Sequence, residues 1–182
     1  MSKQKLSQIT GKIAQILKST EAKYCLLGGL AVVLHGYIRA TRDVDFLVEG
    51  LDSWEPILLE AKSLGLELRE QDKELADEGL LFLRGLQDPS FGVDLLRVES
   101  TFEHELLGRT ESHSVDNVDI PVIALEDLIL LKLSVGRPQD DADAEALIQL
   151  RRTDIDEAKM QRLAQQLGIE SKFQTFWGSE EE

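Results

Sequence analysis

Two aspartates one residue apart, Asp43 and Asp45, lie in the apolar run DVDFLVEG and are the first candidates for chemistry. Side chains alternate along a strand, so both carboxylates would project from the same face. Like charges at this spacing repel unless a cation lies between them, and carboxylate oxygens suit Mg²⁺, which keeps other positions for substrate phosphates. The pair predicts a metal-dependent site for phosphate chemistry. The competing interpretation is an ordinary solvent-facing side of a strand.

The paired glycines Gly28 and Gly29 stand between an apolar run and a short segment of helical character. Glycine lets the backbone approach a ligand closely, and the first amides of a helix attract anions. A nucleoside triphosphate would fit such a turn. Taken alone, the same glycines also suit a tight strand-to-helix turn without any ligand.

A third carboxylate would complete a site for two metal ions. Asp94 is the only charged residue in the apolar run GVDLL. If its strand neighbours the strand of Asp43 and Asp45, the three acids converge. The alternative for Asp94 is a salt bridge or a helix cap.

Lys132 is the only charged residue in LILLKLSV. A lysine removed from water needs a partner or loses its proton, and a bound phosphate would be that partner. A packed stem that carries the ammonium group to the surface is the other interpretation.

The elements that position these residues alternate between α and β. Helical periodicity, apolar runs and glycine stops predict a mixed α and β fold, with a solvated acidic loop over residues 70–79. The expected helices cover residues 4–19, 29–36, 53–65, 124–138, 139–152 and 154–168, and the expected strands cover 23–28, 43–50 and the runs LELRE, GLLFLRGL and FGVDLLRV.

Composition narrows the range of partners. The 182 residues include 20 basic and 34 acidic side chains, for a net charge of −14, so extended binding to nucleic acid is not expected. The single cysteine, Cys25, provides no disulfide framework and suits a reducing cytoplasm. No apolar segment is long enough to cross a membrane, so we expect a cytoplasmic protein with no membrane partner.

The order of these features resembles the polymerase β nucleotidyltransferase superfamily. Thirteen residues separate Gly28-Gly29 from Asp43-Val44-Asp45, and a lone strand aspartate, Asp94, follows. The blocks GGLAVVLHGYIRATRDVDF and ALEDLILLKLSVGRPQDDADAEAL are more narrowly similar to the small bacterial group of AbiEii-like and minimal nucleotidyltransferases, over roughly residues 22–150. The resemblance implies the nucleotidyltransferase fold: a small mixed β-sheet flanked by helices in a core of residues 1–124, with a C-terminal helical segment of residues 125–182 packed on it.

The resemblance also implies roles for particular residues. Asp43, Asp45 and Asp94 would bind Mg²⁺, two ions in all, and Asp94 could instead activate the acceptor. Gly28 and Gly29 would hold the triphosphate. The second position of the turn often carries serine in the family, so backbone contacts must suffice at Gly29.

A second set would surround the nucleotide. The resemblance places a phosphate-contacting lysine at Lys132, followed by an arginine and aspartates that match Arg137, Asp140 and Asp143. A basic residue often precedes the first of those aspartates in the family, and Gln139 stands there in this chain.

Arg39, Thr41 and Arg42 precede the strand of the acid pair, and at least one of them is expected to reach a phosphate. Solvation of a turn, or neutralisation of the acids, would explain them equally well.

The predicted activity is transfer of a nucleoside monophosphate from a nucleoside triphosphate to an acceptor hydroxyl, with release of pyrophosphate. The resemblance suggests a toxin-antitoxin or phage-defence setting. The acceptor stays open between a tRNA end, a protein side chain and a small molecule. The alternative function is a nucleotide-binding, catalytically silent partner or antitoxin-like module.

Overall fold

The computed structural model describes residues 3–178 and divides the chain into two compact units. Unit 1 contains the chain up to Leu30 together with Ala40–Ile123, and unit 2 contains Ala31–Arg39 together with the chain from Ala124 onward. We expected a division at residue 124 of the sequence. The structure adds that residues 31–39 belong to the helical unit. The chain therefore leaves unit 1 within the helix α2 (Gly28–Leu34) and returns to unit 1 before the next strand.

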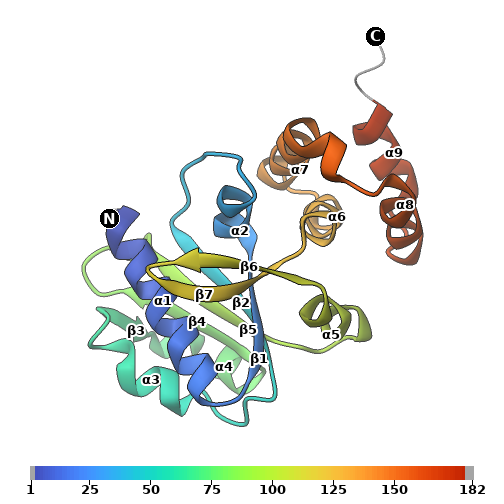
Figure 1. The fold of residues 1–182 in the computed structure, drawn as a ribbon. Helices are drawn as coiled ribbons and strands as arrows, with labels where there is room; N and C mark the ends of the chain where they lie inside the picture. The colour runs from blue at the N-terminus through green and yellow to red at the C-terminus, as the bar shows by residue number, and fades with distance from the viewer. Residues whose placement is uncertain (1–2, 179–182) are drawn as a thin grey trace. The chain divides into compact units, whose positions relative to one another are not determined.

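One mixed sheet forms the centre of unit 1 (Figure 1). Within the described residues it has seven strands in the order β3-β4-β5-β2-β1-β7-β6. Strand β2 lies between β1, with which it pairs antiparallel, and β5, with which it pairs parallel. The strands are β1 (Lys23–Leu27), β2 (Asp43–Glu49), β3 (Leu66–Leu68), β4 (Leu80–Gly85), β5 (Gly92–Arg97), β6 (Thr110–Val115) and β7 (Val118–Ile123).

Alternation along the central strands separates two faces of the sheet. Val44, Phe46 and Val48 of β2 are fully buried on one face. The intervening residues, Asp43 and Asp45 among them, belong to the other face. The period-2 pattern of the sequence therefore sets which side chains form the core and which are available for chemistry.

The helices of unit 1 are α1 (Lys3–Ser19), α3 (Glu55–Ala61), α4 (Lys73–Asp77), which follows a 3₁₀ turn at Glu70–Asp72, and α5 (Thr101–Gly108). The prediction of a loop over residues 70–79 was wrong. Ala76 of α4 is buried, and its carbonyl accepts a hydrogen bond from Nε1 of Trp54 at 3.0 Å. The acidic composition of this segment gave no sign of the tertiary contact that stabilises the short helix α4.

Helix α5 and the hairpin of β6 and β7 were not predicted from the sequence. Ser100 begins α5 with a capping box, in which its hydroxyl accepts from the amide of Glu103 and the Glu103 carboxylate accepts from the amide of Ser100. His104 of α5 lies 2.5 Å from Glu49, which shares the face of Asp43 and Asp45. Helix α5 thus contacts the end of β2 that lies opposite Asp43.

Unit 2 is helical. Its helices are α6 (Leu125–Val135), α7 (Pro138–Arg151), α8 (Glu157–Gln166) and α9 (Glu170–Gly178), with a 3₁₀ turn at Arg152–Asp154. Gly136 ends α6 in the left-handed region at φ 69°, and Pro138 begins α7 at a position where no amide is needed. Among residues 3–178, no helix combines the length and apolar character that crossing a bilayer requires.

Candidate active site

The strand pairing brings the three predicted acids onto one face of unit 1. In the parallel ladder of β2 and β5, Asp45 pairs with Asp94, and Asp43 pairs with Gly92. Neighbouring strands lie about 4.8 Å apart, so Asp45 and Asp94 are cross-strand neighbours and Asp43 is one step along the same face. The condition set by the sequence, that the strand of Asp94 should adjoin the strand of the acid pair, is met.

Arg84 of β4 is a residue of this face that sequence analysis did not identify. In the antiparallel ladder of β4 and β5, Phe82 pairs with Asp94 and Arg84 with Gly92. The Nη1 atom of Arg84 donates a short hydrogen bond to Oδ1 of Asp94. The available signal was the alternation of LLFLRG, which places Arg84 and Phe82 on one face, but the strand pairing could not be read from the sequence.

The electrostatics of the face follow from this arrangement. Desolvation and the charge of Asp94 raise the pKa of Asp43, against the opposing influence of Arg84. Burial would lower the pKa of Arg84, but its hydrogen bond to Asp94 and the charges of Asp94 and Asp43 outweigh burial and raise that pKa. The carboxylates are thus crowded enough to repel one another, and a cation is favoured among them.

Gly28 is required by the acid beside it. Its φ of 69° lies in the left-handed region, and a Cβ at this position would stand only 2.6 Å from Cγ of Asp45. Any side chain would therefore push the Asp45 carboxylate away. Gly29 follows as the second residue of α2. The close approach explains the first glycine on structural grounds, whether or not the turn also holds a phosphate.

Comparing Gly28→Ala with Gly50→Ala isolates that contact. Gly50 also has a positive φ, 77°, but nothing lies within 4 Å of its hypothetical Cβ. Both alanine variants should lose about 1–2 kcal/mol of stability from backbone strain. Only Gly28→Ala should also weaken Mn²⁺ binding, measured by electron paramagnetic resonance. Equal Mn²⁺ affinities in the two variants would contradict a role for the Gly28 contact in shaping the site.

The segment before β2 divides between the two units. Thr41 belongs to unit 1, and its hydroxyl donates to the carbonyl of Asp43 at 3.3 Å. Arg42 donates to the Ser90 hydroxyl at 3.0 Å. Arg39 belongs to unit 2, where its Nε lies 2.6 Å from Asp143. The structure therefore gives protein partners to residues for which the sequence suggested a phosphate or solvation of a turn.

Lys132, Asp140 and Asp143 form a buried charge cluster in unit 2. The Lys132 ammonium lies 2.6 Å from Asp140 and 3.0 Å from Asp143, and all three residues are buried. Arg137 adds a second contact to Asp140 at 2.6 Å. Burial acts to raise the pKa of Asp140, but the hydrogen bonds from Arg137 and Lys132 outweigh it and the pKa lies below its ordinary value.

This cluster removes the physical argument that linked Lys132 to phosphate. The sequence showed a lysine in an apolar run that needed a partner, and the structure supplies two carboxylates one helix away. The turn at Gly136 reverses the chain, so that α7 presents Asp140 and Asp143 to α6. Phosphate binding by Lys132, Arg137 and Asp140 stays a prediction that rests on the family resemblance alone.

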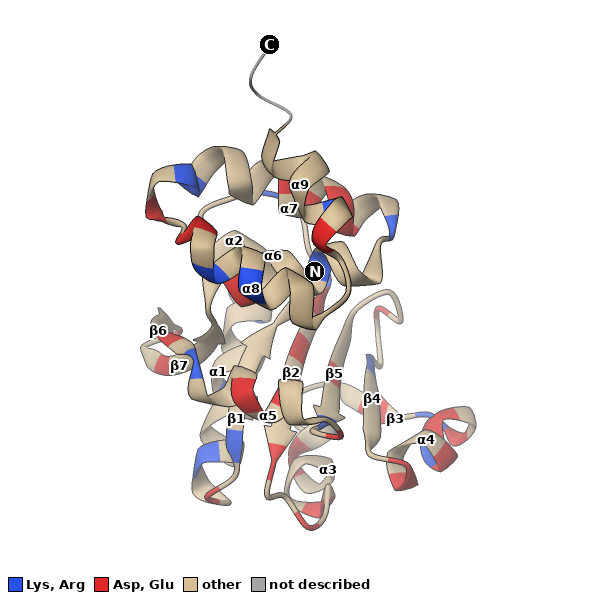
Figure 2. Ribbon diagram, turned by 90° about the vertical axis from the view of Figure 1, so that its right-hand side faces the viewer, with Lys and Arg blue, Asp and Glu red and all other residues tan. Residues whose placement is uncertain are grey.

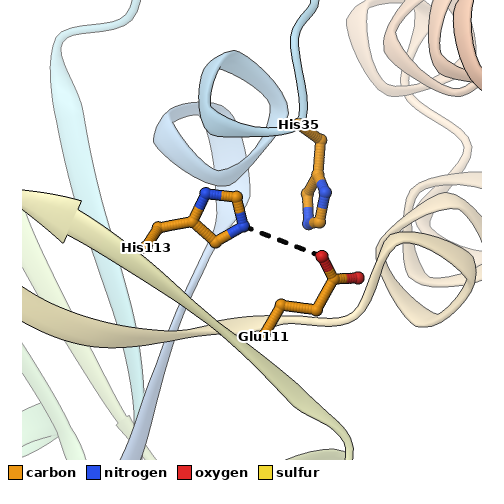
Figure 3. A group of neighbouring side chains, drawn as sticks. All are labelled: His35, Glu111 and His113. Atoms are coloured by element: carbon orange, nitrogen blue, oxygen red, sulfur yellow. Dashed lines mark ion pairs between the residues drawn. The ribbon is translucent and has the colours of Figure 1, made fainter.

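A further pair of titratable residues lies on β6. Glu111 and His113 of β6 make an ion pair of 3.8 Å within unit 1 (Figure 3). His35, also drawn there, follows α2 and belongs to unit 2. Acidic residues are spread over many strands and helices of the chain (Figure 2), so the composition alone does not locate the site.

Comparisons with known proteins agree on the fold. No protein-family model matches the chain, and no curated protein sequence does. Among solved structures, ANT(2″)-Ia in complex with adenylyl-2″-tobramycin is similar with a TM-score of 0.59 and 13% identity, over 92% of this chain and 98% of that one.

Two further structures support the same fold. The lincomycin-bound lincosamide antibiotic adenylyltransferase LnuA is similar with a TM-score of 0.53 and 15% identity, over 81% and 96% of the two chains. An antigenic nucleotidyltransferase-like protein from Paracoccidioides brasiliensis gives a TM-score of 0.50 and 17% identity, over 82% and 78%. The chain has the nucleotidyltransferase fold, as the sequence predicted.

Proposed function

We propose that this protein is a Mg²⁺-dependent nucleotidyltransferase that moves a nucleoside monophosphate from a nucleoside triphosphate to an acceptor hydroxyl. The observation that carries the proposal is the pairing of Asp45 with Asp94, with Asp43 on the same face. The nucleotidyltransferase fold supports it, and the three acids lie on the neighbouring strands β2 and β5 near the middle of the sheet. The further assignment to the AbiEii-like group, with a toxin-antitoxin or phage-defence role in the cytoplasm, rests on the sequence alone.

The chemistry of the donor set fits divalent cations. Asp43, Asp45 and Asp94 offer hard oxygen ligands, and Gly28 leaves the space that the Asp45 carboxylate needs. Bound Mg²⁺, with two ions proposed, would supply charge stabilisation at the phosphates and at the attacking oxygen.

The proposed reaction is an in-line substitution at phosphorus. The acceptor oxygen forms a bond to the α-phosphorus, the bond from that phosphorus to the bridging oxygen breaks, and pyrophosphate leaves. Asp94 takes the proton of the acceptor hydroxyl. Gly28 and Gly29 bring backbone close to the triphosphate at the start of α2. The role of Asp94 as base requires Arg84 to release it, since the guanidinium is bonded to Asp94 in this structure.

We favour a small molecule with a hydroxyl group as the acceptor. Two of the three solved structures named above carry lincomycin or an adenylylated tobramycin. The net charge of −14 would attract a cationic acceptor and repel a nucleic acid backbone. A tRNA end or a protein side chain remains an alternative acceptor.

The contact between Arg84 and Asp94 favours one alternative function. A carboxylate that already holds a protein cation is less open to metal, as expected for a nucleotide-binding module that has lost transfer. Binding of nucleotide without release of pyrophosphate would select this function.

The test is incubation with each α-³²P nucleoside triphosphate, Mg²⁺ and either aminoglycoside and lincosamide acceptors or cell extract. We expect label on a small molecule, together with stoichiometric pyrophosphate. Label on RNA or protein would change the acceptor class. Nucleotide binding without label transfer to any fraction would contradict the proposed activity.

A further inference from the structure

The geometry points to Arg84 as the resident counter-cation of the acidic face, the sheet face that carries Asp43, Asp45 and Asp94. A divalent cation that binds at Asp94 must displace Arg84, and the displaced Arg84 then binds the anionic nucleotide. This inference deepens the proposed function and rests on it. It assigns a role to a residue outside the predicted site. The role is to make binding of cation and nucleotide depend on each other.

The first observation is that Arg84 contacts a proposed metal ligand directly. Its Nη1 donates to Oδ1 of Asp94, and the two side chains are only 24% and 20% exposed. A guanidinium and a divalent cation cannot both take the same carboxylate oxygen. Binding of a cation at Asp94 is therefore weakened by the free energy needed to break the existing ion pair between Arg84 and Asp94.

The second observation is the space that admits the guanidinium. Gly92 pairs with Asp43 on one side and with Arg84 on the other. A Cβ on Gly92 would come within 3.1 Å of both Cζ of Arg84 and Oδ1 of Asp43. Because Gly92 has no side chain, the guanidinium of Arg84 has room to lie beside both Asp43 and Asp94.

The third observation concerns where Arg84 can go. The guanidinium lies 5.4 Å from the centre of the Phe82 ring, and its Nη1 also donates to the Leu83 carbonyl at 3.0 Å. These contacts keep the side chain on the acidic face after Asp94 is taken. A planar guanidinium binds phosphate oxygens in a two-point arrangement, so the triphosphate is a suitable second partner.

The test compares Arg84→Gln with Arg84→Lys in two binding measurements. In the first, Mn²⁺ alone is titrated and followed by electron paramagnetic resonance. Arg84→Gln should bind Mn²⁺ at least about fivefold more tightly than the unmodified protein, while Arg84→Lys stays closer to it. In the second, ATP is titrated at saturating Mg²⁺, where Asp94 is occupied and Arg84 is released, and Arg84→Gln should bind ATP at least about fivefold more weakly.

The matched control is Arg109→Gln. Arg109 of unit 1 pairs with Glu105 at 3.1 Å, so its loss changes the net charge equally without touching Asp94. It should move neither affinity by more than twofold. Asp94→Asn should remove the Mn²⁺ gain of Arg84→Gln, because the carboxylate for which the two cations compete is gone.

The outcomes separate this inference from the proposed function. Unchanged or weaker Mn²⁺ binding by Arg84→Gln overturns the competition, even if transfer activity is found. Tighter Mn²⁺ binding with unchanged ATP binding overturns the nucleotide half of the inference. If the unmodified protein neither binds ATP nor transfers label, the proposed function fails, while tighter Mn²⁺ binding by Arg84→Gln still supports Arg84 as the resident cation.

Discussion

Asp43→Asn is expected to reduce nucleotidyl transfer by at least about 10³-fold while the fold is retained. The substitution removes one oxygen donor and one negative charge from the face that Asp43 shares with Asp45 and Asp94. The pKa of Asp43 is raised by desolvation and by Asp94, so the ionised form is disfavoured in the folded protein. A raised carboxyl pKa lowers stability as the pH rises through it. The variant should therefore be at least as stable as the unmodified protein at pH 7.

Asp119→Asn is the matched control for this prediction. Asp119 is an exposed aspartate of β7, at a strand position outside the three-acid face. Label transfer from α-³²P nucleotide should be unchanged in Asp119→Asn, and both variants should melt within about 2 °C of the unmodified protein. Undiminished transfer by a folded Asp43→Asn protein would refute the assignment of Asp43.

Lys132→Met is expected to destabilise the protein by about 3 kcal/mol. Lys132 is buried between Asp140 and Asp143, and its removal leaves two buried carboxylates with fewer cations. Asp143 keeps Arg39 and Asp140 keeps Arg137, which limits the loss. The measurement is the urea midpoint, followed by circular dichroism.

Lys159→Met provides the comparison within unit 2. Lys159 pairs with Glu126 at 3.1 Å, but its side chain is 30% exposed, so its loss should cost less than about 1 kcal/mol. Lys132→Met with an unchanged urea midpoint and lost transfer would favour the phosphate role that the family resemblance implies. A large loss of stability identifies the lysine as the structural centre of the helical unit.

The same cluster predicts sensitivity to acid. The pKa of Asp140 lies below its ordinary value of 3.8, so the stability that this carboxylate contributes is present above about pH 4. It is lost as the pH falls through the depressed pKa in the folded protein. Thermal melts between pH 7 and pH 3 should show a smaller acid-induced decrease in Lys132→Met than in the unmodified protein. An equal decrease in both proteins would contradict the contribution of Lys132 to this pKa.

The sequence by itself determined the strand that carries Asp43 and Asp45, the short helix after Gly28, and the apolar strand of Asp94. Period-2 alternation and glycine stops are local signals, because they depend on residues within a few positions of one another. The same locality explains why helix α4 was missed within the acidic stretch of residues 70–79. The hydrogen bond from Trp54 to Ala76 spans 22 positions and leaves no periodic trace in an acidic segment.

Only the tertiary structure decided which charges meet. The pairing of Asp45 with Asp94 spans 49 positions of the sequence, and Arg84 joins them only because β4 pairs with β5 in one register. A shift of one residue in that ladder would turn Arg84 to the opposite face. Lys132 shows the reverse case. A charge in an apolar helix demands a counter-charge, but only the packing of α7 on α6 decides that Asp140 and Asp143 provide it.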